Sequence, residues 1–227
     1  MEQDFSLALL AAAAGTLDVL GFRQLGPALL SAMTGNGALL GLAIGQHRFA
    51  AALHSLAAFG GFVAGVAGGS VLLDDAGDGW SPRVTVVVSI EAVLLGAFAL
   101  LWLTIGGPRS EIVIYALILL ASGGMGLQSV AVRQLRIPGV TTTFFTGTLT
   151  SIVTSVVRAG EHKRPTSMIP QLVVLLAYVG AAAVASLTAA HGAGAVALLP
   201  VAVVVVVLAG RAIAGSDVTR TGKDGSC

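Results

Sequence analysis

The chain has 227 residues, of which 56% are hydrophobic and only 10% are charged. Soluble domains carry about a quarter charged residues, so this composition excludes an ordinary soluble domain and favours a protein of the lipid bilayer. The formal net charge of +1 supplies no basic field, and we therefore expect no nucleic-acid partner. The single cysteine, Cys227, rules out an intramolecular disulfide and a thiolate metal site.

Apolar runs long enough to cross about 30 Å of hydrocarbon as helices recur along the chain. They lie at residues 5–22, 49–73, 84–105, 112–132, 167–189 and 194–214. Two shorter segments, 34–46 and 146–158, reach only about 20 Å as helices. The sequence therefore predicts an all-α integral membrane protein, a helical bundle of six to eight spans in one transmembrane domain, residues 1–215. Residues 216–227 are expected to form a disordered cytoplasmic tail.

Each short segment follows a stretch that could be extended, at 28–33 and at 140–145, the second rich in β-branched and aromatic residues. Irregular backbone at membrane depth persists only where it is buried in protein or lines a cavity. If an extended stretch and a half-helix together complete a crossing, the chain crosses eight times, and this is the count that we expect. If the short segments instead leave on the side where they enter, it crosses six times.

The basic residues predict the orientation of the chain under the eight-crossing arrangement. One side then carries Arg48, Arg109, Arg158, Lys163, Arg164, Arg211, Arg220 and Lys223, and the other carries Arg23, Arg83, Arg133 and Arg136. Lys and Arg concentrate in cytoplasmic loops of membrane proteins. Both termini are therefore expected to be cytoplasmic.

Two parts of the sequence about 110 residues apart resemble each other. Arg-Gln-Leu occurs at 23–25 and 133–135, and Thr-Gly follows at 34–35 and 146–147, with a two-residue difference between them. The pattern predicts two repeated halves, about 5–105 and 112–214. Transporter folds are often built from such halves, with the ligand site at their interface. Four crossings in each half would make the halves parallel, whereas three would make them inverted.

Small and polar residues mark the start of each short segment. A helix start has unpaired N–H groups and a partial positive charge, Thr or Asn can cap it, and Gly lets a ligand approach. The candidate ligand-binding residues are Thr34, Gly35, Asn36, Thr146, Gly147 and Thr148. Ordinary capping at a buried break requires the same residue types, so both interpretations stay open.

Arg23 and Arg133 occupy matching positions at the ends of two spans. Two such guanidinium groups could bind an anionic ligand or pair with carboxylates inside the bundle. The alternative is an interfacial arginine whose head reaches the headgroup region. We keep both residues as ligand-binding candidates.

Asp18 and Glu91 fall inside apolar runs, where a charge is costly unless it is paired, protonated or in contact with water. Either could carry a proton or an ion in coupled transport. The alternatives are a salt bridge from Asp18 to Arg23 or to another helix, and interfacial solvation of Glu91. Gln128 occupies the repeat position of Asp18 and is a neutral polar candidate for ligand binding. His54 is expected to be a structural histidine.

Other features limit the function classes. Gly61, Gly65 and Gly69 recur at four-residue spacing, which is typical of closely packed membrane helices. No phosphate-binding loop, zinc-protease motif or nucleophile elbow occurs in the sequence. We therefore expect no enzymatic activity, no cofactor and no metal site.

Two longer patterns resemble a known family. Gly126-Leu-Gln-Ser-Val-Ala-Val-Arg133 is followed by Thr141-Thr-Thr-Phe-Phe-Thr-Gly-Thr-Leu-Thr150, and Met33-Thr-Gly-Asn36 occurs in the first half. With these motifs the chain resembles the YoaK family of bacterial membrane proteins over roughly residues 5–213. Many members have Asn where this chain has Ser129. The resemblance implies a multi-span bundle in the bacterial inner membrane and supplies no substrate.

The leading hypothesis is a secondary transporter or permease for a small molecule or ion, with the ligand between the two Thr-Gly half-helix starts. A small anionic or polar solute, membrane lipids and a second copy of the chain are the expected partners. The alternative is a scaffold or regulatory partner that transports nothing. An intramembrane enzyme acting on lipid is a third and weaker hypothesis, because no nucleophile and base pair is recognisable.

Overall fold

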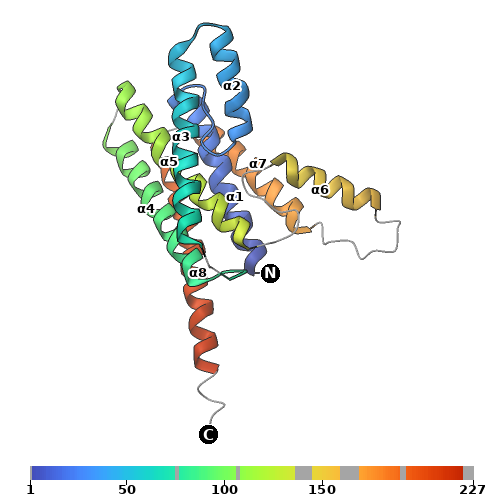
Figure 1. Cartoon of the computed structure of the whole chain (residues 1–227). Coiled ribbons are helices and arrows are strands. Elements are labelled where there is room, and N and C mark those ends of the chain that lie inside the picture. The colour runs from blue at the N-terminus through green and yellow to red at the C-terminus, as the bar shows by residue number, and fades with distance from the viewer. Residues whose placement is uncertain are drawn as a thin grey trace.

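The computed structural model describes residues 2–74, 77–105, 108–135, 145–158, 169–189 and 193–221. These residues form helices joined by short connections, and no strand occurs among them (Figure 1). The helices are α1 (Glu2–Leu20), a π-helical continuation η1 (Gly21–Leu25), α2 (Met33–Gly45), α3 (Phe49–Leu72), α4 (Pro82–Thr104), α5 (Glu111–Gln134), α6 (Phe145–Arg158), α7 (Ile169–Ala189) and α8 (Ala193–Thr221). The predicted helical membrane bundle is confirmed.

Six helical segments are long and apolar enough to cross a membrane, and they agree with the six long apolar runs of the sequence. They are Asp4–Leu25, Phe49–Leu72, Pro82–Thr104, Glu111–Gln134, Ile169–Ala189 and Gly194–Ala214. With 13 and 14 residues, α2 and α6 are too short to cross alone.

The last helix is longer than predicted, because α8 continues to Thr221. The helix thus includes residues 216–221 of the segment expected to be a disordered tail, while residues 222–227 lie outside the described part of the chain. Gly215 does not end the helix, since adding one residue to an existing helix is far easier than starting a new one.

The first turn of α1 and the C-terminal part of α8 lie at the same end of the bundle (Figure 1). We call this end of the bundle the terminus end. Here Arg211 of α8 donates a hydrogen bond to the hydroxyl of Ser6 in α1 at 3.4 Å, and its guanidinium lies 4.5 Å from the centre of the Trp80 ring. Next to Trp80, the N–H of Gly79 donates to the carbonyl of Gln134 at the end of α5. Thus α1 begins, and α5 and α8 end, at the terminus end.

Contacts at the opposite end, which we call the α2 end, complete the path of the chain. Arg23 at the end of the first span bonds Ser186 near the end of α7. His54 near the start of α3 lies 3.2 Å from a carboxylate oxygen of Glu111 at the start of α5. A Cβ on Gly26, which has φ of +106°, would overlap the His54 ring, so the turn after η1 lies against α3 at this end.

The short helix α2 does not complete a crossing, which corrects the expected eight crossings. Residues 26–32 turn back along α1, so that α2 begins beside Asp18 and ends at the α2 end, where it is joined to α3 (Figure 1). The predicted extended stretch at 28–33 is irregular rather than a strand, because its polar groups bond to side chains instead of to a neighbouring strand.

The re-entrant course of α2 also changes the grouping of the basic residues. Among those described, Arg23, Arg48 and Arg109 lie at the α2 end, whereas Arg83, Arg133 and Arg211 lie at the terminus end. Arg48 and Arg109 are therefore on the side opposite to Arg211, contrary to the expectation. The reason is that α2 enters and leaves at one end, which reverses the sides of the connections from α2 to α5. Because α5 ends and α7 begins at the terminus end, the segment that holds α6 undoes this reversal, and Arg211 keeps its side.

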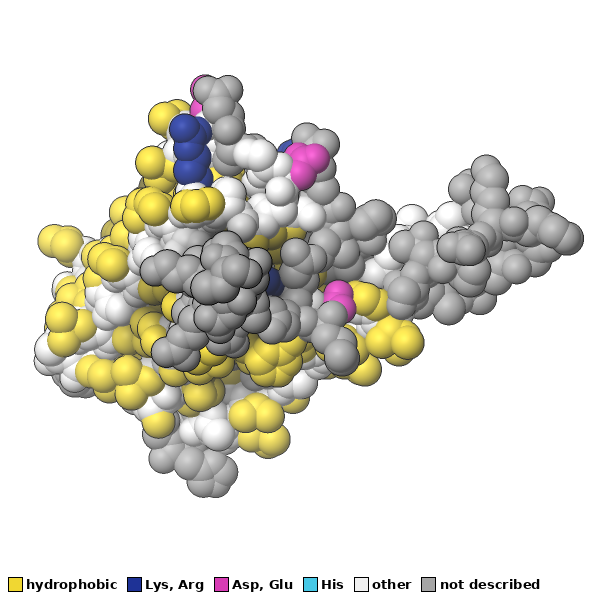
Figure 2. All heavy atoms as spheres, turned by 90° about the horizontal axis from the view of Figure 1, so that it is seen from below, with side chains coloured by type: hydrophobic (Ala, Val, Ile, Leu, Met, Phe, Trp, Pro, Cys, Tyr) yellow, Lys and Arg dark blue, Asp and Glu magenta, His cyan; other side chains and the backbone are white. Residues whose placement is uncertain are grey.

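The outer faces of the helices are apolar, as a lipid environment requires. A view along the bundle from the terminus end shows apolar side chains around its sides and few charged ones (Figure 2). Val93 and Leu100 of α4 and Leu176 of α7 are 64–70% exposed on two such faces. In water this surface would be a liability, whereas in a bilayer it contacts lipid tails.

Close helix packing in the bundle depends on glycine. On the α3 face that meets α5, Gly61 and Gly65 approach the α5 backbone so closely that an added Cβ would overlap Leu119 or Gly123. Gly126 of α5 meets the carbonyl of Phe62 in the same way. The glycine stripe therefore packs as predicted, with α3 against α5 and, on the other side of the bundle, α1 against α7.

Replacing Gly65 by Ala should separate α3 from α5 and lower the free energy of unfolding by about 1–3 kcal/mol, the usual cost of overpacking. Gly68 in the same helix is the matched control, because its Cβ would meet nothing within 4 Å. Gly68→Ala should be neutral or stabilising, by up to about 1 kcal/mol, through helix propensity. Denaturation in mixed micelles measures both, and equal effects of the two changes would contradict the packing described.

Candidate functional site

A buried carboxylate holds the break between the first span and α2. Asp18 is 3% exposed, and its Oδ1 accepts hydrogen bonds from the backbone N–H of Ser31 at 2.7 Å and of Ala32 at 3.4 Å. Its Oδ2 accepts from the hydroxyls of Ser31 at 2.7 Å and Tyr178 at 2.5 Å. Asp18 therefore joins α1, the irregular segment 26–32 and α7, and its partner in another helix is Tyr178 rather than the Arg23 considered from the sequence.

The start of α2 is already occupied by this carboxylate. Ser31 and Ala32 directly precede the helix, and Asp18 Oδ1 lies where an anion would meet the partial positive charge of its first turn. In this conformation the chain itself supplies the anion that the sequence led us to expect from a ligand.

The three predicted ligand residues of α2 play different parts. Asn36 is fully buried, and its side chain accepts from the N–H of Leu29 at 2.8 Å and donates to the Leu29 carbonyl at 2.5 Å. Gly35 lies against the Leu29 side chain, which a Cβ there would overlap, and Thr34 is exposed. Neither Thr34 nor Asn36 caps the helix, because the capping position is Ala32 and has no side-chain hydrogen bond.

The candidate ligand residues of the predicted second half lie in α6. Thr146 and Gly147 are exposed, and Thr148 is fully buried. Gln171 of α7 donates to the Ser151 hydroxyl at 3.1 Å and ties α6 to α7. The predicted extended stretch at 140–145 falls almost entirely on residues outside the described ranges.

Gln128, at the predicted repeat position of Asp18, is fully buried in α5. Its Nε2 donates to the carbonyl of Leu10 in α1 at 3.1 Å, so this amide joins two helices deep in the bundle. It lies nearer the terminus end than Asp18 does, because α5 runs opposite to α1.

The two arginines cannot contact one ligand. Arg23 is exposed at the α2 end, where it donates to the carbonyl oxygen of Ser186 at 3.1 Å and to its hydroxyl at 2.7 Å. Arg133 is exposed at the end of α5, at the terminus end. A whole membrane thickness of about 30 Å lies between the two ends. Arg23 and Arg133 therefore cannot both attract a ligand that is held at one place.

Glu91 is the least satisfied polar group of the described bundle. It has no exposed surface, and neither carboxyl oxygen has a hydrogen-bond partner among the described residues. It lies about 14 Å along α4 from the terminus end, close to mid-membrane. A Cβ on Gly124 of α5 would come within 3.7 Å of its Cγ, so the carboxyl is packed against the glycine-rich face of α5. Water at the membrane surface therefore does not solvate Glu91, which was the alternative considered from the sequence.

Ser31 and Tyr178 were not recognised as site residues from the sequence. A tyrosine inside an apolar span is a usable signal, because its buried hydroxyl needs a partner. Ser31 carries no such signal, since its role arises from the turn that brings it back to Asp18. His54 packs against the Tyr115 ring at 5.2 Å and beside Glu111, as expected of a structural histidine. Among the described residues no cluster of His, Cys, Asp or Glu could hold a metal ion.

Six apolar spans with polar groups gathered inside them define a multi-pass helical membrane protein. Residues 6–210 match the family described as "Protein of unknown function (DUF1275)", and the chain belongs to this family. It is 38% identical over 148 residues to "UPF0700 transmembrane protein YoaK" of Bacillus subtilis (strain 168). The aligned region covers 65% of this chain and 64% of that relative. The resemblance to the YoaK family is thereby confirmed. No solved structure matches the chain.

Proposed function

We propose that this chain is a small secondary transporter for a polar or anionic solute, with the break at Asp18 as its moving part. The observation that carries the proposal is a buried carboxylate that holds an irregular, re-entrant segment through hydrogen bonds alone. Discontinuous helices of this kind form the ligand and ion sites of many transporters. Polar groups inside spans are costly and are functional by default.

The site alternates between a closed state and a ligand-bound state. In the closed state the Asp18 carboxylate occupies the start of α2 and accepts the Tyr178 hydroxyl of α7. A solute anion that takes the place of the carboxylate at this helix start releases Tyr178, so that α7 moves relative to α1. Thr34 supplies an exposed hydroxyl at the start of α2, whereas Gly35 is covered there by the Leu29 side chain in the closed state. Each half-helix start binds separately, Arg23 serving one end and Arg133 the other.

Glu91 carries the coupling proton. A carboxyl without hydrogen-bond partners at mid-membrane is stable there only as the neutral acid, and it can ionise when water or a cation reaches it. Asp18 is a poorer carrier, because its oxygens already accept hydrogen bonds from three residues. Glu91 lies on α4, which contacts α5 and α8. Movement of these helices changes the access of water to Glu91, and its ionisation is therefore coupled to their packing.

The arrangement of contacts supports two inverted halves, α1 to α4 and α5 to α8. The packing of α3 against α5 corresponds to that of α7 against α1, and the packing of α4 against α5 to that of α8 against α1. The first span runs away from the terminus end and α5 runs toward it. In inverted halves the same helix packing occurs twice with opposite orientations across the membrane. When the two halves exchange conformations, the ligand site opens to the other side, and many transporters alternate access in this way.

The termini face the cytoplasm of the bacterial inner membrane. By their place in the sequence, eight of the twelve Lys and Arg residues belong to helix ends at the terminus end, or to segments that connect or follow such ends and lie partly outside the described residues: Arg83, Arg133, Arg136, Lys163, Arg164, Arg211, Arg220 and Lys223. The α2 end has Arg23, Arg48 and Arg109 among the described residues. The positive-inside rule then makes the terminus end cytoplasmic.

Uptake into liposomes tests the proposal. Purified protein should take up at least one member of a panel of labelled small anions, amino acids and sugars in a saturable way. Asp18→Ala should abolish this uptake, and Asp74→Asn, at an exposed carboxylate after α3, should leave it unchanged. Failure to move any solute, combined with a stable complex with another membrane protein, would overturn the proposal in favour of a scaffold.

A further inference from the structure

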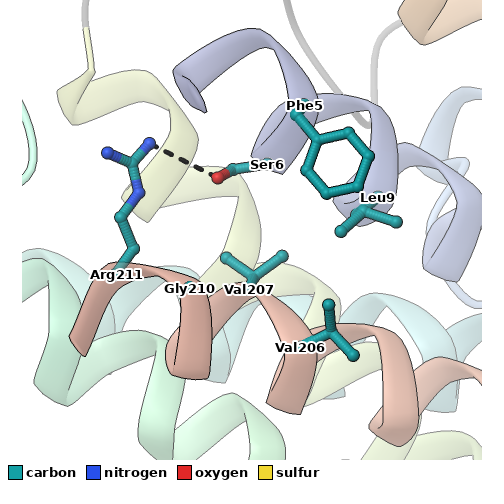
Figure 3. Close-up of a pocket in the computed structure, with 7 residues that line it drawn as sticks. All are labelled: Phe5, Ser6, Leu9, Val206, Val207, Gly210 and Arg211. Carbon is teal, nitrogen blue, oxygen red and sulfur yellow. Dashed lines mark hydrogen bonds between the residues drawn. The ribbon is translucent and has the colours of Figure 1, made fainter. Parts of the chain in front are cut away.

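A crevice opens between the first turns of α1 and the C-terminal part of α8 (Figure 3). Its volume is about 160 Å³. The lining is apolar except for one hydroxyl and one guanidinium, and it consists of Phe5, Ser6, Leu9, Val206, Val207, Gly210 and Arg211. The Arg211 guanidinium, which also bonds Ser6 and stacks on Trp80, brings a cationic group to one end of the crevice.

The crevice lies at the level where a lipid changes from tail to headgroup. The first span begins at Asp4 and the last ends at Ala214, so Ser6 and Arg211 both lie within one turn of the span ends. Arg211 is also stacked on Trp80, and tryptophan marks this interfacial level in membrane proteins. Val206 and Leu9 lie further along their helices, toward the hydrocarbon.

We propose that this crevice binds an anionic phospholipid, with its phosphate on Arg211 and Ser6 and an acyl chain along Phe5, Leu9 and Val206. A guanidinium binds phosphate oxygens through paired hydrogen bonds, and the Ser6 hydroxyl lies 3.4 Å from it to provide a second donor. The absence of a side chain at Gly210 leaves room for the chain to enter between the helices. The inference is independent of the transport activity proposed above.

Native mass spectrometry of the full chain in detergent, with phosphatidylglycerol or phosphatidylcholine added, tests this site. Wild-type protein should retain phosphatidylglycerol in preference to phosphatidylcholine. Arg211→Ala should lower its retention about tenfold, the effect expected for losing one charge-assisted contact. Arg83→Ala, at an exposed arginine of the same end, is the matched control and should retain the lipid as the wild type does.

A second variant acts on the apolar part and leaves the charge in place. A Cβ on Gly210 would meet nothing within 4 Å, so Gly210→Leu should fold normally and fill the crevice. Its melting temperature without lipid should match that of the wild type, while lipid retention should fall. Equal retention of both lipids by the wild type, or undiminished phosphatidylglycerol retention in Gly210→Leu and Arg211→Ala, would overturn the proposal.

Discussion

Asp18→Ala should lower the free energy of unfolding by about 3–5 kcal/mol, because several buried donors lose their acceptor at about 1–3 kcal/mol each. The substitution removes the acceptor of the N–H groups of Ser31 and Ala32 and of the hydroxyls of Ser31 and Tyr178. The two N–H groups cannot find water at this depth, so they keep their desolvation penalty. The loss should release segment 26–32 from α1 and detach α7 at this level.

Thermal and denaturant unfolding in mixed micelles measure this effect. Tyr178→Phe removes one of the hydrogen bonds and should cost about 1–2 kcal/mol. Asp18→Asn should lie between Tyr178→Phe and Asp18→Ala, because an amide keeps one acceptor oxygen. Asp74→Asn is the matched control at an exposed carboxylate and should change stability by less than about 0.5 kcal/mol. An Asp18→Ala protein as stable as the control would show that the carboxylate does not hold the break.

Glu91→Met is expected to have the opposite effect on stability, raising the free energy of unfolding by about 1–3 kcal/mol while abolishing proton-driven uptake. The side chains are similar in length, and Met removes a buried carboxyl that has no hydrogen-bond partner among the described residues. A side chain that lowers stability and is nevertheless needed for activity has a functional role, because active sites are often less stable than an optimised core.

Glu91→Gln is the companion variant, because it keeps a polar group of the same shape but cannot ionise. It should leave stability within about 1 kcal/mol of the wild type and abolish proton coupling as Met does. Both variants are measured by denaturation and by uptake in the same preparation. Destabilisation by Met of more than about 1 kcal/mol would mean that Glu91 has a structural partner, and it would count against the coupling role.

Much of the fold follows from the sequence, because span length and apolar content are set by bilayer thickness. The six long runs were predicted for this reason. The close contacts of Gly61, Gly65 and Gly69 were predicted from their four-residue spacing. The course of α2 was not, since a re-entrant segment and a completed crossing have the same composition. What decides between them is the hydrogen bond from Ser31 to Asp18, a contact that depends on the turn at Gly26.

The polar site was predictable in its residues but not in its connections. Asp18, Glu91 and Gln128 stood out as polar groups within apolar runs, and all three are buried. That Asp18 is fully bonded while Glu91 has no partner among the described residues depends on which helices meet, and no local pattern encodes it. The opposite positions of Arg23 and Arg133 likewise follow from helix direction, which the repeat alone left open between parallel and inverted halves.

Coupling through Glu91 is tested by solute uptake into proteoliposomes under an imposed pH gradient, with wild type and Glu91→Gln side by side. The wild type should accumulate a solute while the gradient lasts and release it when an uncoupler removes the gradient. Glu91→Gln should fold and bind the same solute, as judged by thermal shift, but should not accumulate it. Uptake that ignores the gradient in the wild type, or that persists unchanged in Glu91→Gln, would contradict the coupling role of Glu91.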